Sequence, residues 1–228
     1  LAFLSEGKEE DAKDILDAFV YAVSYDRGKI PRIRNVYAAG DVSGGNDGRV
    51  RLPGVYDAAT GQWQEDANYV GSSAGNTAWV ALALLWYDAL YGDREDTATY
   101  VATAGVLMDW VEKYCTDDTP GFTAGLEGWP ENGVSDTYPL TYKSLEHNVD
   151  CYVAFDRLYA LTGKEEYLQS AQSALSFITD MYDRKKGMFL TGTLSDGITA
   201  DTDRMVLDAQ AWTALALEDE FPAYRRKL

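Results

Sequence analysis

The sequence predicts an all-α fold, an incomplete α/α toroid of helical hairpins whose long loops gather at one mouth. Three observations predict it. Apolar residues recur at helical spacing in six segments, densely apolar segments alternate with amphipathic ones, and a glycine turn recurs between paired segments. The 228 residues suffice for one domain over residues 1–228, and the 46% of hydrophobic residues is typical of a globular chain.

The predicted helices fall into two alternating kinds. An amphipathic helix buries one face and belongs to an outer layer, whereas a helix that is apolar nearly all round is covered on most sides. We therefore expect an inner row of helices shielded by an outer row. The amphipathic segments are residues 11–25, 97–114 and 165–182, and the inner segments are residues 76–91, 144–161 and 203–217.

A repeated turn supports this pairing. Near Gly7, Gly92 and Gly163 the chain shows the end of one helix, a glycine suited to a left-handed helix cap, and a charged start to the next helix. A second echo aligns GNTAWVALALL, from Gly75, with LDAQAWTALAL, from Leu207. The repeat predicts stacked hairpins that cannot bury their inner faces singly.

Both ends of the sequence look like halves of hairpins. Residues 1–4 align with the tail of an inner helix, and residues 208–217 resemble an inner helix without an outer partner. We therefore expect a fragment of a larger ring. Such a fragment would expose an apolar edge beside Leu1 and Leu217, through which copies could associate.

Three long connections are rich in Gly, Pro, Asp and Trp. Loops of this length in a compact domain usually carry function or small strands. Each joins an outer helix to the next inner helix, so all of them must meet at one mouth. The connections are residues 27–73, 116–142 and 184–202.

The composition excludes several classes of function. A formal net charge of −17 repels phosphate backbones, so we expect no nucleic-acid partner. No apolar run reaches the length of a membrane span. Neither a phosphate-binding loop nor a dinucleotide or zinc motif is present, so we expect no cofactor and no metal. The two cysteines, Cys115 and Cys151, lack redox spacing, and a disulfide between them stays open.

The run KSLEHNVDCYVAFDRLYALTGKEEYLQSA, with GNTAWVALALLWY before it and LDAQAWTALAL after it, resembles the six-hairpin glycosidase-like superfamily. It is similar to bacterial members in which an EHN-x-D segment opens an inner helix. The resemblance implies a toroid with a cleft at its mouth, an oligo- or polysaccharide substrate, and glycosidases, lyases or epimerases as the usual activities. It also slightly favours a secreted or periplasmic protein.

Two carboxylates stand at the start of one predicted inner helix. Glycoside hydrolysis needs a carboxylic acid and a second carboxylate across a cleft. Glu146 and Asp150 are four residues apart and share one helix face at the mouth. The positive helix N-terminus would keep both ionised, which suits a base and hinders an acid. The alternative is that Glu146 only complements the helix dipole and Asp150 is solvated or paired.

Two more carboxylates complete the catalytic candidates. Asp41 lies in the glycine-rich segment YAAGDVSGGND, and Asp208 begins the last inner helix. A tight turn is the alternative explanation for Asp41. The same segment offers oxygen ligands for Ca²⁺, although it lacks the spacing of a known calcium loop.

Aromatic residues of the loops are candidates for sugar stacking. Trp63 and Trp129 lie in the mouth loops, where Glu127 could bond hydroxyls, and His147 flanks Glu146. The alternative is that the tryptophans only pin their loops. The tryptophans at helical spacing are expected in the core instead: Trp79, Trp86 and Trp110.

The pattern Gly71-Ser-Ser-Ala-Gly75 matches a serine nucleophile elbow. A true elbow follows a strand of a parallel sheet, and no such alternation of strands and helices is present. We therefore interpret Ser72 or Ser73 as a helix cap.

Together these observations favour a carbohydrate-active enzyme, glycoside hydrolase-like, with carboxylate general acid/base catalysis. A single histidine counts against epimerases that use two. The rival hypothesis is a helical scaffold or carbohydrate-binding module without catalysis.

Overall fold

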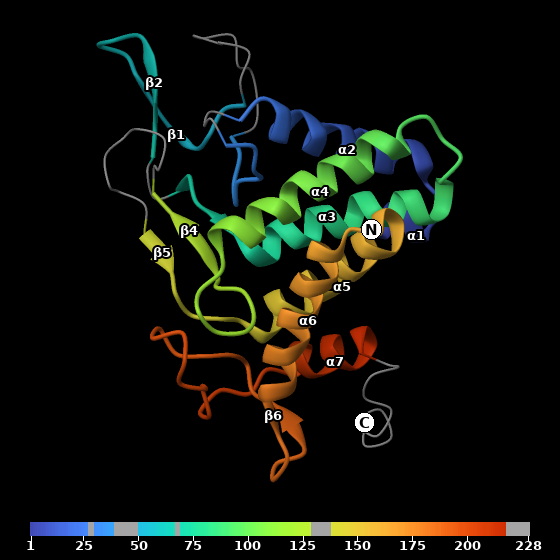
Figure 1. Ribbon diagram of the computed structural model, residues 1–228. Coiled ribbons are helices and arrows are strands. Elements are labelled where there is room, and N and C mark those ends of the chain that lie inside the picture. The colour runs from blue at the N-terminus through green and yellow to red at the C-terminus, as the bar shows by residue number, and fades with distance from the viewer. Residues whose placement is uncertain (27–29, 39–49, 67–68, 129–137, 218–228) are drawn as a thin grey trace.

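The computed structural model describes residues 1–26, 30–38, 50–66, 69–128 and 138–217, and this part of the chain is mainly helical (Figure 1). The predicted all-α class is therefore confirmed. The helices are α1 (Ala2–Ser5), α2 (Glu9–Ser24), α3 (Ala74–Tyr91), α4 (Thr97–Tyr114), α5 (Leu145–Thr162), α6 (Glu165–Asp180) and α7 (Leu207–Ala216).

The helices form an inner and an outer row. Helices α3, α5 and α7 follow one another in the inner row, with α4 packed on α3 and α6 packed on α5. Helix α2 lies against α4 and α3 at one end of the row (Figure 1). The burial follows the sequence pattern, because α3 buries ten of its 18 residues and amphipathic α2 buries four of its 16.

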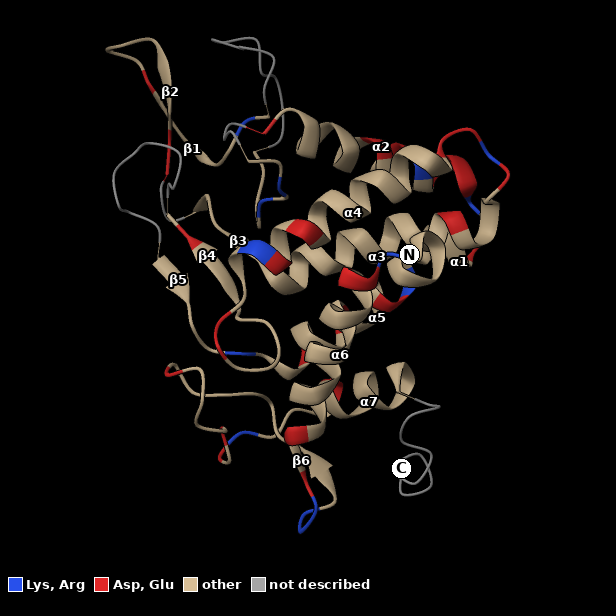
Figure 2. Cartoon of the chain, in the orientation of Figure 1, with Lys and Arg blue, Asp and Glu red and all other residues tan. Residues whose placement is uncertain are grey.

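The starts of the two kinds of helix are stabilised differently. Outer helices α2 and α6 begin with acidic residues, 9–11 and 165–166, which complement the positive N-terminal end of the helix. Figure 2 shows acidic residues, coloured red on the cartoon, on α2 and at the turn between α3 and α4, at the rim of the molecule. Inner helices α3 and α5 begin at serine caps, where Ser73 and Ser144 accept backbone hydrogen bonds. The prediction that a serine of the GSSAG segment caps a helix is thus confirmed for Ser73.

Two of the three predicted glycine caps have left-handed backbones. The φ angles are 71° at Gly7 and 67° at Gly163, which favour glycine. The prediction is wrong for Gly92, which keeps right-handed helical geometry with a φ of −57°. A Cβ at Gly92 would lie 3.0 Å from the Asp88 carbonyl oxygen, so a side chain at this position would crowd that oxygen.

The long connections carry short strands, as expected. Strands β1 (Gly54–Asp57) and β2 (Gln62–Glu65) pair antiparallel, β4 (Gly125–Glu127) pairs with both β3 (Ser72–Ser73) and β5 (Tyr138–Leu140), and β6 (Tyr182–Asp183) pairs with β7 (Met188–Phe189). Strand β4 lies near the N-terminal end of α3, whereas β6 lies at the end of α6 (Figure 1).

Helix α7 starts later than predicted. The pattern placed its start near residue 203, whereas the helix begins at Leu207. The Asp201 carboxylate accepts hydrogen bonds from the backbone N–H groups of Asp203 and Arg204, which closes a turn there instead. The chain then reaches α7 in extended geometry at Val206.

Equivalent amide side chains tie the mouth loops to the inner helices. Asn148, the fourth residue of α5, accepts from Phe122 N at 2.7 Å and donates to Phe122 O at 3.0 Å. Gln210, the fourth residue of α7, makes the same pair of bonds with Phe189, at 2.9 and 2.7 Å. Since both amides are buried and satisfied, each loop is fixed relative to its helix.

A buried ion pair fixes the segment after α2. Arg34 binds the two carboxylate oxygens of Asp26 at 2.7 and 2.6 Å, and its third bond goes to Val70 O at 2.7 Å. Such a two-pronged contact is the strongest form of ion pair between side chains. It joins the α2 end to the strand that leads into α3.

The two cysteines are buried free thiols. Burial raises the pKa of Cys115 to about 12, and burial likewise raises that of Cys151. Within the described ranges, no helix is long and apolar enough to cross a membrane. The same ranges contain no group of three or more His, Cys, Asp or Glu side chains arranged to hold a metal ion.

Candidate functional site

The inner helices present equivalent positions at their N-terminal ends. The second residues of α3, α5 and α7 are Gly75, Glu146 and Asp208, and the sixth residues are Trp79, Asp150 and Trp212. Because a helix has 3.6 residues per turn, the second and sixth residues lie on one face, one turn apart. The three helices therefore bring carboxyl and indole groups together in two layers.

Asp150 lies in the lower layer and is buried, with 1% of its surface exposed. Its Oδ1 accepts a hydrogen bond of 2.6 Å from Trp212 Nε1, while Oδ2 has no partner among the described residues. Burial raises the pKa of Asp150 to about 7; the Trp212 bond opposes this rise and the charge of Glu146 adds to it. The protonated form of this carboxyl is therefore favoured more strongly than in an exposed aspartate.

Glu146 and Asp208 form the upper, exposed layer. Burial and the nearby charge of Asp208 raise the pKa of Glu146. The carboxyls of Glu146, Asp150 and Asp208, which we call the carboxyl cluster, are therefore close enough to influence one another across α5 and α7. An elevated pKa in a group of carboxyls is typical of a functional site.

The predicted effect of the helix N-terminus on these carboxyls is wrong. The macrodipole was expected to keep Glu146 and Asp150 ionised, but both pKa values are raised. The dipole acts mainly within the first turn, and Asp150 already lies in the second. Burial of a carboxylate without full hydrogen bonding outweighs the dipole there. The direction favours an acid where a base was expected.

Two tryptophans form a stacked wall beside the cluster. The rings of Trp79 and Trp212 are 5.0 Å apart and inclined by 24°, and Trp212 also binds Asp150. Both side chains are partly exposed, so the prediction of a purely core role for Trp79 is wrong. The missed signal was the alignment of GNTAWVALALL with LDAQAWTALAL, which gives both tryptophans the same position.

His147 lies over the start of α3. Burial lowers its pKa, and Nδ1 has no partner within the described residues. A Cβ at Gly75 would fall 2.2 Å from His147 Cδ2, so only glycine leaves room for the ring. A neutral imidazole has one N–H donor and one acceptor nitrogen, so it can donate a hydrogen bond to a hydroxyl group or accept one from it.

Within the described residues, no contact brings the remaining sequence candidates to the carboxyl cluster. Trp63 Nε1 donates to Leu52 O at 2.9 Å and its ring lies under the Arg51 guanidinium at 4.8 Å, so it pins the β1–β2 hairpin. Glu127 is exposed at the end of β4. Asp41 and Trp129 lie outside the described residues.

An apolar groove of about 340 Å³ continues from the tryptophan wall along the inner row. It contains Leu1, and Trp86 is 51% exposed in it, which corrects its predicted place in the core. Trp110 is buried as expected, and Leu217 itself is 1% exposed, whereas Leu207 and Leu215 of the adjoining helix, α7, are 80% and 71% exposed. The groove is lined by Leu1, Ala2, Ser5, Trp79, Leu82, Trp86, Val153 and Trp212.

Several solved structures are similar in fold. A D-mannose isomerase shares 20% identity with a TM-score of 0.50, over 73% of this chain and 42% of its own. A cellobiose 2-epimerase from Spirochaeta thermophila shares 19% identity with a TM-score of 0.53, over 71% of this chain and 42% of its own. A metagenome-derived family 9 endoglucanase shares 18% identity with a TM-score of 0.54, over 95% of this chain and 45% of its own.

At these identities the likeness is one of fold, and the chain spans less than half of the length of each of these proteins. No family model and no curated protein matches the sequence.

Proposed function

We propose that this protein, which has the α/α-toroid fold of the six-hairpin glycosidase-like superfamily, is a carbohydrate-processing enzyme that hydrolyses glycosidic bonds. The observation that carries the proposal is the carboxyl cluster, in which Glu146 has a raised pKa beside Asp208. Oligo- or polysaccharides are the proposed substrates. The names of the similar structures support a saccharide substrate.

Glu146 is the proposed general acid. Its exposed position allows it to reach a glycosidic oxygen, and its raised pKa favours the protonated form that a general acid needs. Asp208, on the neighbouring helix, is the proposed base or nucleophile. Asp150 lies below them and holds the Trp212 ring in place through its hydrogen bond. The wall of Trp79 and Trp212 gives a sugar ring an apolar face to stack on.

Sugar epimerisation is the nearest alternative chemistry, because two of the similar structures are named as an epimerase and an isomerase. A two-base proton transfer needs a group on each face of the sugar. The described site offers one histidine, His147, whose pKa burial lowers. The pair of neighbouring carboxyls favours hydrolysis over that reaction.

The test is product analysis by NMR on a panel of α- and β-linked disaccharides incubated with the 228-residue chain. Hydrolysis releases monosaccharides, whereas epimerisation changes the sugar without cleavage. Glu146→Gln keeps the size of the side chain but removes the proton. We expect it to lower turnover at least about 10²-fold, a typical contribution of general acid/base catalysis.

Glu95→Gln is the matched control, because Glu95 is an exposed glutamate in the turn between α3 and α4, at the other end of the helices. Turnover by Glu95→Gln should equal that of the wild type. Equal turnover by Glu146→Gln would refute its role as the acid. Absence of turnover on every substrate would refute the enzyme proposal for this chain.

A second candidate is a carbohydrate-binding scaffold without catalysis, and the apolar groove favours it. Trp86 and Leu1 leave an apolar surface of the inner row exposed. We propose that copies of the chain associate through this face. Sedimentation at increasing concentration should show a dimer, and Trp86→Glu should remove it; a monomer at every concentration would refute self-association.

A further inference from the structure

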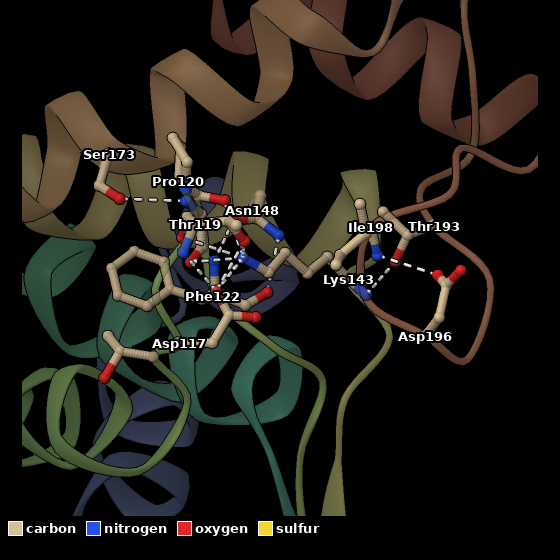
Figure 3. Close-up of polar contacts among 12 residues, drawn as sticks. Asp117, Thr119, Pro120, Phe122, Lys143, Asn148, Ser173, Thr193, Asp196 and Ile198 are labelled. Carbon is tan, nitrogen blue, oxygen red and sulfur yellow. Dashed lines mark hydrogen bonds and ion pairs between the residues drawn. The ribbon is translucent and has the colours of Figure 1, made fainter.

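A buried ammonium group lies at the base of the mouth, outside the carboxyl cluster. The side chain of Lys143 is 1% exposed, and it immediately precedes Ser144, the cap of α5. Four oxygens surround Nζ: Asp117 Oδ1 at 2.7 Å, Thr119 Oγ1 at 2.7 Å, Pro120 O at 2.9 Å and Thr119 O at 3.0 Å. A fifth, Gly121 O, lies at 3.5 Å. Figure 3 shows this cage of oxygens converging on the end of the lysine side chain.

The cage has more acceptors than the ammonium has donors. An ammonium group has three N–H donors, so five surrounding oxygens must share them. One carboxylate, one hydroxyl and three carbonyl oxygens are the kind of set that replaces the water shell of a cation. Burial raises the pKa of Asp117, and the hydrogen bonds from Lys143 and Thr119 outweigh it, so that this pKa lies below its usual value. The single negative charge of the cage therefore balances a monovalent cation.

The cage joins three segments of the mouth. Through its backbone, Lys143 accepts from Thr193 N at 2.8 Å and donates to Thr193 Oγ1 at 2.8 Å, in the loop that leads to α7. Through its side chain it holds the loop that follows α4. A Cβ at Gly192 would lie 2.0 Å from Lys143 O, so the backbones approach closely here. Asn148 holds the same loop one turn further along α5, at Phe122.

We infer that the oxygen cage of Asp117, Thr119, Pro120 and Gly121 is a monovalent-cation site whose cation is built into the chain as the Lys143 ammonium. The distances around Nζ exceed the about 2.3–2.6 Å of calcium–oxygen contacts, so the cage is too wide for Ca²⁺. Potassium and ammonium ions are the free cations of matching charge and size. Removal of the lysine side chain should open the cage to them, whatever reaction the protein catalyses.

The experiment compares thermal unfolding of the wild type and of Lys143→Ala in potassium, ammonium and tetramethylammonium chloride at equal ionic strength. Tetramethylammonium is too large to enter the cage. In that salt we expect Lys143→Ala to unfold roughly 6–20 °C below the wild type, because breaking a buried ion pair is strongly destabilising. Potassium or ammonium at about ten times its dissociation constant should raise the unfolding midpoint of Lys143→Ala by roughly 3–6 °C.

Lys143→Met is the matched control, because its side chain fills the space of the lysine stem without a charge. It should lose stability and respond alike to all three salts, as the wild type should. A Lys143→Ala variant with the wild-type midpoint, or with the same midpoint in all three salts, would overturn the inference.

Thr119→Val covers the case in which Lys143→Ala does not fold in any salt. It removes one cage oxygen and leaves the lysine in place. The inference predicts a lowered midpoint in every salt, and an unchanged midpoint would overturn it.

Discussion

Replacement of Asp150 by asparagine should stabilise the protein at alkaline pH. Asp150 is 1% exposed, and its pKa of about 7 compares with about 3.9 in an unfolded chain. Because the folded state holds its proton more tightly, the carboxyl contributes stability below pH about 4 and loses it as the pH rises to about 7. Three units correspond to about 4 kcal/mol. Asparagine has no charge to bury and still accepts the bond from Trp212 Nε1.

Urea denaturation at pH 4, 7 and 9 measures this effect. We expect Asp150→Asn to match the wild type at pH 4 within about 1 kcal/mol, the worth of one altered hydrogen bond. At pH 9 the variant should exceed the wild type by up to about 4 kcal/mol. Asp118→Asn is the control, since Asp118 is exposed and the same chemical change there should have no such dependence on pH. A variant less stable than the wild type at pH 9 would refute the claim that the buried charge of Asp150 destabilises the folded state.

Two further substitutions probe the neighbours of this carboxyl. Trp212→Phe keeps an aromatic ring but removes the donor to Asp150, so the pKa of Asp150 should rise above about 7. Because a hydrogen bond to a charged group is lost, the free energy of unfolding at pH 9, measured by urea denaturation, should fall by about 1.5–3 kcal/mol. A carbon-13 titration that leaves this pKa unchanged would contradict the bond. Gly75→Ala forces a methyl group to 2.2 Å from the His147 ring and should cost about 1–3 kcal/mol, whereas Gly105→Ala in α4 meets only a hydroxyl at 3.2 Å. Equal melting temperatures for the two alanine variants would refute the close contact.

The helices were predictable because apolar residues recur at helical spacing along the chain, and these residues are the ones that the fold buries. The pattern gave the outer and inner rows and the bounds of α4, and the mouth position of Glu146 and Asp208 followed from the direction of the chain. The start of α7 was not predictable from periodicity, because side-chain bonds at Asp201 close a turn within an apolar pattern. Local hydrogen bonds of this kind compete with a helix at its end.

The candidate site was predictable in part. Glu146, Asp150 and Asp208 were singled out as carboxylates at the starts of inner helices, but their pKa directions depend on burial, which a sequence does not display. The bond between Asp150 and Trp212 depends on the relative height of α5 and α7. Trp79 looked like core because the helix around it is apolar nearly all round, and only its partners in space leave its ring partly open.

The Lys143 cage was not foreseen. Its oxygens come from a loop more than 20 residues earlier in the chain, and three of them are backbone carbonyls, which carry no sequence signal. Sequence patterns reveal which helices form, whereas contacts between loops and helices follow from tertiary packing.

The most direct test of the account is a carbon-13 NMR titration of the Glu146 side-chain carboxyl in the wild type and in Asp208→Asn. The central claim is that carboxyls of α5 and α7 meet at one mouth, so that the charge of Asp208 raises the pKa of Glu146. The account predicts a raised pKa for Glu146 in the wild type and a lower value in the variant. The same pKa in both proteins would contradict it, because the two carboxyls would then not share a site.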